Sequence, residues 1–234
     1  MKILVINPNS SRQMTAHLDR ALRQIKSEQT ELTVTCPPNG PLAIESAYDE
    51  AMCVPGVLAL VEKANKEHFD AVILACFSDP ALEQAREISD ILIMGIEETS
   101  LHVAAMLGAK FTVLTMTERR IPSKAAHVRR FRLEESLASI RPLGMSVAEI
   151  EEDEARACAQ ILKVSREAAE QDGAEVIVLG YAGMAGYAQI VREQLGVEVI
   201  DPSCVTLKVT EALVSAGVKQ SKWGYYSYPP SMCV

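Results

Sequence analysis

The chain has 234 residues, 48% of them hydrophobic, and a formal net charge of −8 at pH 7. This apolar fraction is ample for the core of one large domain or two small ones. The acidic balance argues against nucleic acid as a partner, and the longest apolar runs are far shorter than the ~20 residues of a membrane helix.

The start of the chain, "MKILVINPNS", carries one lysine and enters a strand-like run without a cleavage-site pattern. We therefore expect no secretory signal and a cytoplasmic location. Six cysteines are scattered without a Cys-x-x-Cys pair or a histidine at ligand spacing, which argues against a zinc site and against a disulfide framework. The sequence predicts no metal site.

Runs of β-branched and aliphatic residues alternate with amphipathic stretches, a pattern typical of a parallel sheet covered by helices. The predicted strands are 2–6, 32–35, 71–75, 91–94, 110–115, 140–143, 175–179 and 197–200. The predicted helices are 12–27, 47–67, 80–88, 99–107, 124–138, 153–171, 187–194 and 203–216. The aromatic, Pro-rich segment 222–231 is predicted to be a tail that lies across the body.

A weak internal repeat divides this pattern in two. "KILVINPNS" from Lys2 is matched by "KFTVLTMTE" from Lys110, "DAVILAC" by "EVIVLGY", and "ILIMGI" by "VEVIDP", all in the same order. The repeat predicts an α/β protein of two pseudo-symmetric lobes, each a three-layer sandwich around a parallel sheet. The first lobe would comprise 1–96 plus about 204–234, and the second 97–203.

Ligands of parallel sheets bind outside the carboxyl ends of the strands, so the active site is expected in a cleft between the lobes. We expect the residues that directly follow the strands to converge there. They are Asn7, Asn9, Cys76 to Asp79, Gly95 to Glu97, Thr115, Thr117, Tyr181 to Met184, and Asp201.

Cys76 stands at the exit of a buried strand, with Pro80 predicted in the first turn of the next helix. A thiol at a helix N-terminus is stabilised as a thiolate and serves as a base or nucleophile. An inert buried cysteine is the equally weighted alternative. The glycine-rich run "GYAGMAG" fits neither a dinucleotide fingerprint nor a P-loop, so no nucleotide cofactor is expected.

Several motifs together resemble the hydantoin and allantoin racemase branch of the aspartate/glutamate racemase superfamily. They are "NPNSSRQMT", "GPLAIESAYDE", "ACFSDPALEQARE", "GIEE", "VLTMT", "LGYAGMA" and "VIDPS". The resemblance implies a cofactor-independent racemase of 5-substituted hydantoins or allantoin. In that family two cysteines on opposite faces of a small-molecule substrate remove and return a proton next to a carbonyl.

Cys76 matches the first cysteine of that pair, but the second position holds Tyr181 within an otherwise matching context. A phenol has a pKa near ~10 against ~8.5 for a thiol, and its ring is far larger. The resemblance therefore implies impaired racemisation in this chain. Two alternatives stay open: a one-cysteine relative, either a decarboxylase or a cis-trans isomerase, and a binding protein that has lost the chemistry.

The resemblance also implies substrate contacts, and apolar helix faces favour a homo-oligomer. For Ser46 and the "INPNSS" segment, helix capping is a compatible role. Backbone N–H groups after positions 76 and 181 are expected to stabilise an enolate. The implied substrate-binding residues are Asn9, Glu45, Ser46, Phe77, Ser78, Thr117, Ala182 and Gly183.

Overall fold

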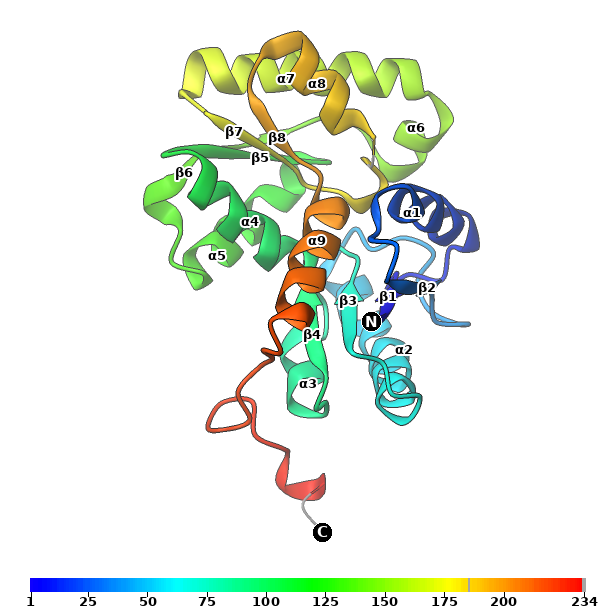
Figure 1. Cartoon of the computed structure of the whole chain (residues 1–234). Coiled ribbons are helices and arrows are strands. Elements are labelled where there is room, and N and C mark those ends of the chain that lie inside the picture. Colours follow the sequence, from blue (N-terminus) through cyan, green and yellow to red (C-terminus); the bar gives the residue numbers. More distant parts are fainter. Residues whose placement is uncertain (185, 233–234) are drawn as a thin grey trace. The chain divides into compact units, whose positions relative to one another are not determined.

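The computed structural model describes residues 1–184 and 186–232, in which strands and helices alternate along the chain (Figure 1). The contacts divide the chain into two compact units. Unit 1 comprises residues 1–96 and the segment from Thr206 onward, and unit 2 comprises residues 97–205. Cys233 lies outside the described residues.

Unit 1 is built on four parallel strands in the order β2-β1-β3-β4. These are β1 (Lys2–Ile6), β2 (Glu31–Thr35), β3 (Ala71–Leu74) and β4 (Leu92–Gly95). Its helices are α1 (Arg12–Ile25), α2 (Ala47–Lys66), α3 (Leu82–Glu87) and most of α9 (Pro202–Ser215), followed by the short η4 (Pro230–Met232).

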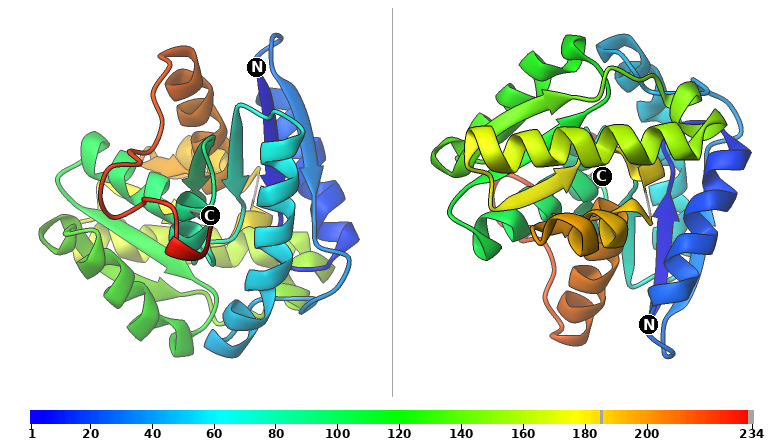
Figure 2. Two further views of the ribbon diagram at one scale, coloured as in Figure 1. Left: turned by 90° about the horizontal axis from the view of Figure 1, so that it is seen from below. Right: turned by 90° about the horizontal axis from the view of Figure 1, so that it is seen from above.

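The sequence explains how α1 forms in unit 1. The Ser11 side chain accepts a hydrogen bond from the Met14 backbone N–H and so caps the helix start. Met14, Leu18 and Leu22 recur every four residues and form its buried face. The helix packs beside the edge strand β2 (Figure 2).

Unit 2 repeats this order of strands, since its sheet runs β6-β5-β7-β8 and all neighbours are parallel. The strands are β5 (Phe111–Thr115), β6 (Leu137–Pro142), β7 (Val176–Leu179) and β8 (Glu198–Ile200). The helical segments are α4 (Ile96–Leu107), η1 (Glu118–Arg120), α5 (Ile121–Arg130), η2 (Glu134–Ser136), α6 (Val147–Glu152), α7 (Glu154–Asp172), η3 (Ala182–Met184) and α8 (Tyr187–Leu195).

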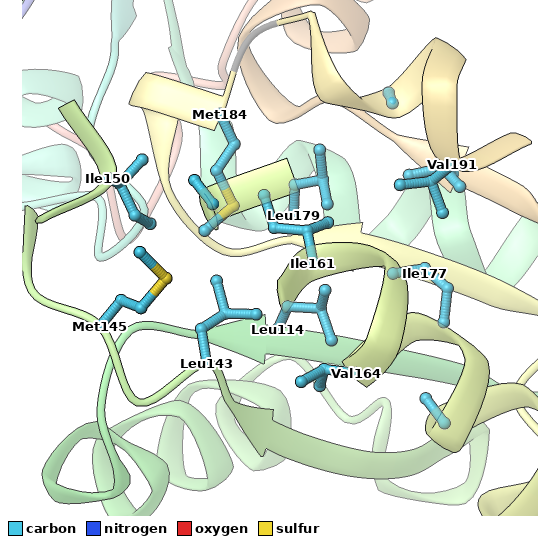
Figure 3. Packing of buried hydrophobic residues seen from close by; sticks show 14 of the residues in the cluster. Leu114, Leu143, Met145, Ile150, Ile161, Val164, Ile177, Leu179, Met184 and Val191 are labelled. Atoms are coloured by element: carbon cyan, nitrogen blue, oxygen red, sulfur yellow. The ribbon is translucent and has the colours of Figure 1, made fainter. Parts of the chain in front are cut away.

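In unit 2, α7 and α8 cover one face of the sheet, and α4 and α5 cover the other (Figure 1). Figure 3 shows Ile161 and Val164 of α7 packed toward Leu114, Leu179 and Val191. The predicted α/β class, with two units each built on a parallel sheet, is confirmed.

One predicted helix is too long, and among the α-helices of the described residues, α6 was not predicted. Helix 124–138 ends at Arg130, because Arg132 adopts a left-handed conformation with φ 59°, and Leu137 already belongs to β6. This edge strand is only half-buried along its length, and its first three residues, before the predicted strand 140–143, do not show the apolar run of a buried strand. The unpredicted α6 starts at a capping box between Ser146 and Glu149. The other predicted elements are confirmed, with bounds within three residues.

Candidate functional site

Cys76 lies just beyond β3 in a tight turn. Its carbonyl accepts hydrogen bonds from the backbone N–H groups of Ser78, at 2.8 Å, and Asp79, at 2.9 Å. The residue is partly exposed, and its Sγ lies 3.5 Å from the Ser78 Oγ, within hydrogen-bonding distance. Phe77 between them is buried. The turn thus presents one thiol and one hydroxyl at the carboxyl edge of the unit 1 sheet.

The backbone that follows Cys76 is strained. Asp79 and Ala81 both have left-handed conformations, with φ of 46° and 68°, which cost a residue with a side chain roughly 1–2 kcal/mol each. The Asp79 carboxylate lies against Gly95, the last residue of β4, where any Cβ would overlap it. Strain of this kind persists only where the surroundings impose it, and it clusters at functional sites. The conformation therefore marks residues 76–81 as a candidate site.

The predicted helix N-terminus at Cys76 is wrong. Pro80 precedes the helix, because α3 begins only at Leu82, and the left-handed Ala81 before it makes no side-chain cap. The N–H groups of Ser78 and Asp79 are directed at the Cys76 carbonyl rather than at the thiol. Any activation of Cys76 therefore comes from the turn and its neighbours, not from a helix end.

A second thiol near the turn stays protonated. Burial, followed by the nearby Cys76 and Glu50, raises the pKa of Cys53 to about 12. Its Sγ donates to the Glu50 carbonyl oxygen at 3.1 Å, and only 2% of the residue is exposed. Cys76, which is partly exposed, is the member of this pair that has access to solvent.

Tyr181 stands at the corresponding place in unit 2, two residues after β7. Gly180 before it donates to the Leu114 carbonyl at 2.8 Å, so closely that a Cβ at position 180 would overlap that oxygen. The Tyr181 ring folds over Gly183, where a Cβ would lie 2.6 Å from the Tyr181 Cζ. The ring also packs against the core of unit 2. A large aromatic side chain thus covers the short η3 turn.

Asn9 and Ser46, predicted to bind substrate, organise helix starts. The Asn9 Oδ1 accepts hydrogen bonds from the Asn7 Nδ2 at 2.7 Å and the Ser11 backbone N–H at 2.9 Å. Ser46 caps α2: its hydroxyl accepts from the Asp49 N–H at 3.2 Å and donates to the Asp49 carboxylate at 2.6 Å. Ser46 therefore has the plain capping role, and Asn9 forms a turn that leads into Ser11, the cap of α1.

The other predicted contacts fall into the two units. Glu45 is exposed just before α2, and its backbone N–H donates to the Asp49 carboxylate at 3.2 Å. Thr117 follows β5, and Ala182 is buried in η3 after the neighbouring β7. Each unit thus gathers its own predicted residues at the carboxyl edge of its own sheet. That both sets act on one ligand stays a prediction.

A buried charged cluster in unit 2 was not predicted. The Glu97 carboxylate is 1% exposed and accepts from Lys124 Nζ at 2.9 Å and His127 Nδ1 at 2.6 Å. Burial opposes ionisation of Glu97, but Lys124 and His127 outweigh it and hold its pKa below the usual value. The one sequence signal is the spacing of three between Lys124 and His127, which places both on one helix face.

Two features are absent from the part of the chain that the structure describes. Among residues 1–184 and 186–232, no group of three or more His, Cys, Asp or Glu side chains is placed to hold a metal ion. Over the same part of the chain, no helix is long and apolar enough to cross a membrane.

Comparisons with known proteins identify relatives along almost the whole chain. The family described as Asp/Glu/Hydantoin racemase matches residues 3–210. A hydantoin racemase of Pseudomonas sp. (strain NS671) is 37% identical over 229 residues, covering 98% of this chain and 92% of the relative. One from Paenarthrobacter aurescens is 36% identical and covers 98% of each. The solved allantoin racemase from Klebsiella pneumoniae superposes with a TM-score of 0.94 at 31% identity, covering 98% of this chain and 94% of that one.

Proposed function

Since the chain belongs to the Asp/Glu/hydantoin racemase family, we propose that it acts on 5-substituted hydantoins or allantoin, moving a proton at the carbon next to a carbonyl. The single observation that carries this proposal is the Cys76 turn. The partly exposed Cys76 follows a central strand, and the turn after it contains the left-handed Asp79, whose carboxylate lies against Gly95. Backbone strain of this kind clusters at functional sites.

In the proposed reaction Cys76 is the base. Its thiolate takes the proton from the stereogenic carbon, and the electron pair of the broken C–H bond moves onto the carbonyl oxygen as an enolate. Fixed hydrogen-bond donors lower the cost of that charge. The Ser78 hydroxyl is the side-chain donor next to the thiol, and we assign it to this role.

Tyr181 limits the proposed reaction. Racemisation requires an acid on the opposite face of the enolate, and a phenol with a pKa near ~10 gives up its proton less readily than a thiol near ~8.5. The ring is also folded onto Gly183 and packed against the unit 2 core. We therefore expect the proton on the Cys76 sulfur, or a solvent deuteron that has replaced it, to return to the face it left.

The test is deuterium incorporation from D2O into one enantiomer of a 5-substituted hydantoin or of allantoin, with optical rotation followed in parallel. Both this chain and Tyr181→Cys are measured. We expect the native chain to exchange with retention of configuration and Tyr181→Cys both to exchange and to racemise. If neither protein exchanges any of these substrates, the proposal is wrong, and a one-cysteine enzyme or a binding protein becomes the better account.

A further inference from the structure

The C-terminal strap, which we define as residues 220–228, follows α9 near the end of the chain (Figure 1). It first contacts β4, the edge strand of the unit 1 sheet. The Gln220 side-chain amide accepts from the Ile93 N–H and donates to the Ile93 carbonyl, both at 2.8 Å. These are the groups that a neighbouring strand would bond, so Gln220 takes the place of a further strand.

The strap next binds the end of α3. Lys222 Nζ donates to the carbonyl oxygens of Arg86 and Glu87, both at 2.7 Å, and to that of Tyr226 at 3.1 Å. Carbonyls in the last turn of a helix have no partner within the helix, and a lysine there satisfies both them and the negative end of the dipole. Lys222 is thus a cap supplied from 135 residues away along the chain.

Side chains on α3 also engage the strap. The buried Arg86 donates from Nη1 to the Tyr226 hydroxyl at 3.2 Å and lies over the same ring at 5.4 Å. The Tyr225 hydroxyl donates to the Glu83 carboxylate at 3.0 Å. By contrast, Trp223 is 94% exposed. The strap therefore acts through polar contacts with α3 and β4 rather than by extending the core with its largest side chain.

Both elements that the strap holds also support the Cys76 turn. The α3 helix continues directly from residues 76–81 and has only six residues, too few to be stable without outside contacts. The β4 strand ends at Gly95, against which the Asp79 carboxylate lies. The left-handed turn at residues 76–81 depends on its surroundings to keep its conformation. It is joined to α3 and contacts the end of β4, and the strap binds both of these elements.

We propose that Lys222 and Gln220 are positioning residues that hold the Cys76 turn in its reactive conformation through α3 and β4. The role as a positioning device rests on the proposed function, in which Cys76 is the base. Loss of Lys222 releases the carbonyls of α3, and the strained turn relaxes away from the geometry that the thiol needs. Small displacements of a reacting group cost about 10- to 100-fold in rate.

The experiment compares Lys222→Met, Lys222→Arg and Gln220→Ala in the full chain, with the exposed-residue variant Trp223→Ala as the matched control. The rate of Cys76 alkylation by iodoacetamide is followed across pH by mass spectrometry of the Cys76 peptide. Deuterium exchange of the hydantoin gives kcat and KM, and thermal melts report folding. We expect Lys222→Met to lower kcat about tenfold with KM nearly unchanged and to alter the alkylation profile of Cys76. Lys222→Arg keeps the positive charge, so its kcat and its Cys76 alkylation profile should stay close to those of the parent.

One result overturns the proposal: Lys222→Met and Gln220→Ala melt earlier but alkylate Cys76 with the rate and pH profile of the parent, so the strap is only structural. Should Lys222→Met not fold, Gln220→Ala decides in the same way. Failure of the parent to exchange any hydantoin contradicts the proposed function alone, because thiol alkylation still measures whether the strap controls Cys76.

Discussion

The turns after β3 and β7 occupy equivalent places in the two units, yet they are built differently. In unit 1 the turn is polar and left-handed and presents a small thiol. In unit 2 a short 3-10 turn lies under the aromatic ring of Tyr181. The same order of strands thus supports two unlike turns, which are the half-sites of the proposed function. The difference lies in both the side chain and the local backbone of each turn, and, on the proposal that Cys76 is the base, it decides which turn can remove a proton.

The largest expected effect separates the two half-sites directly. Replacement of Cys76 by serine should lower deuterium exchange of the hydantoin by at least about 100-fold, because general-base catalysis contributes about 10²–10⁴-fold. Tyr181→Phe should change exchange by less than about threefold, since on this account the phenol delivers no proton. Equal losses in both variants would show that Tyr181 takes part in the exchange and that the half-sites are not so unlike.

The next effect concerns the buried carboxylate of unit 2. Lys124→Met leaves Glu97, which is 1% exposed, without its ammonium partner, and removal of one member of a buried pair costs about 3–5 kcal/mol. Urea unfolding measures the loss. The control is Lys63→Met in unit 1, whose pair with Glu67 is exposed and should contribute less than about 1 kcal/mol. Similar losses of unfolding free energy in the two variants would contradict the expected difference between the buried pair and the exposed pair.

Unit 1 has its own buried carboxylate, Glu211, which gives a test by pH. Burial disfavours its charge, but hydrogen bonds from Thr30, Ser27 and Lys208 outweigh this and lower its pKa from 4.5 to about 2. A depressed carboxyl pKa stabilises the fold above pH 4.5, and this contribution is lost as the pH falls from 4.5 toward 2.

We expect Glu211→Gln to lower the free energy of unfolding by up to about 3 kcal/mol at neutral pH, a difference that shrinks below about pH 4. Denaturant titrations of parent and variant along a pH series measure it. The contact that would be lost joins α9 to the segment between α1 and β2, since Glu211 accepts from the Thr30 hydroxyl at 2.6 Å. A constant difference across the acid range would contradict the assignment.

The smallest effect tests the position of the Tyr181 ring. Gly183→Ala places a Cβ where the ring lies, so it should cost about 1–3 kcal/mol in the native chain. In the Tyr181→Cys background the same change should cost at least about 1 kcal/mol less, because the ring is gone. Chemical unfolding of the parent, the two single variants and the double variant measures both costs. An identical cost in both backgrounds would mean that the ring does not lie over Gly183.

The fold was largely predictable from local patterns, and the one helix that was predicted too long shows where these patterns fail. Buried parallel strands such as Val176–Leu179 are short apolar runs between helical stretches, a pattern that the sequence shows directly. The strand Leu137–Pro142 is at an edge and half-buried, and only its second half was predicted as a strand, because its first residues lack that signature. The end of α5 depends on the left-handed Arg132, which no periodicity indicates.

The candidate site also has features that the sequence predicted and features that it did not. The sequence by itself determined that Cys76 and Tyr181 follow equivalent strands, because strand ends and an internal repeat are local features that survive in a linear pattern. Only the tertiary structure decided that Asp79 rests on Gly95, that the Tyr181 ring covers Gly183, and that Lys222 caps α3. Most such contacts join residues far apart in the chain, and even a near one depends on the rotamer that packing selects, so these partners are settled only once the sheets and helices have assembled.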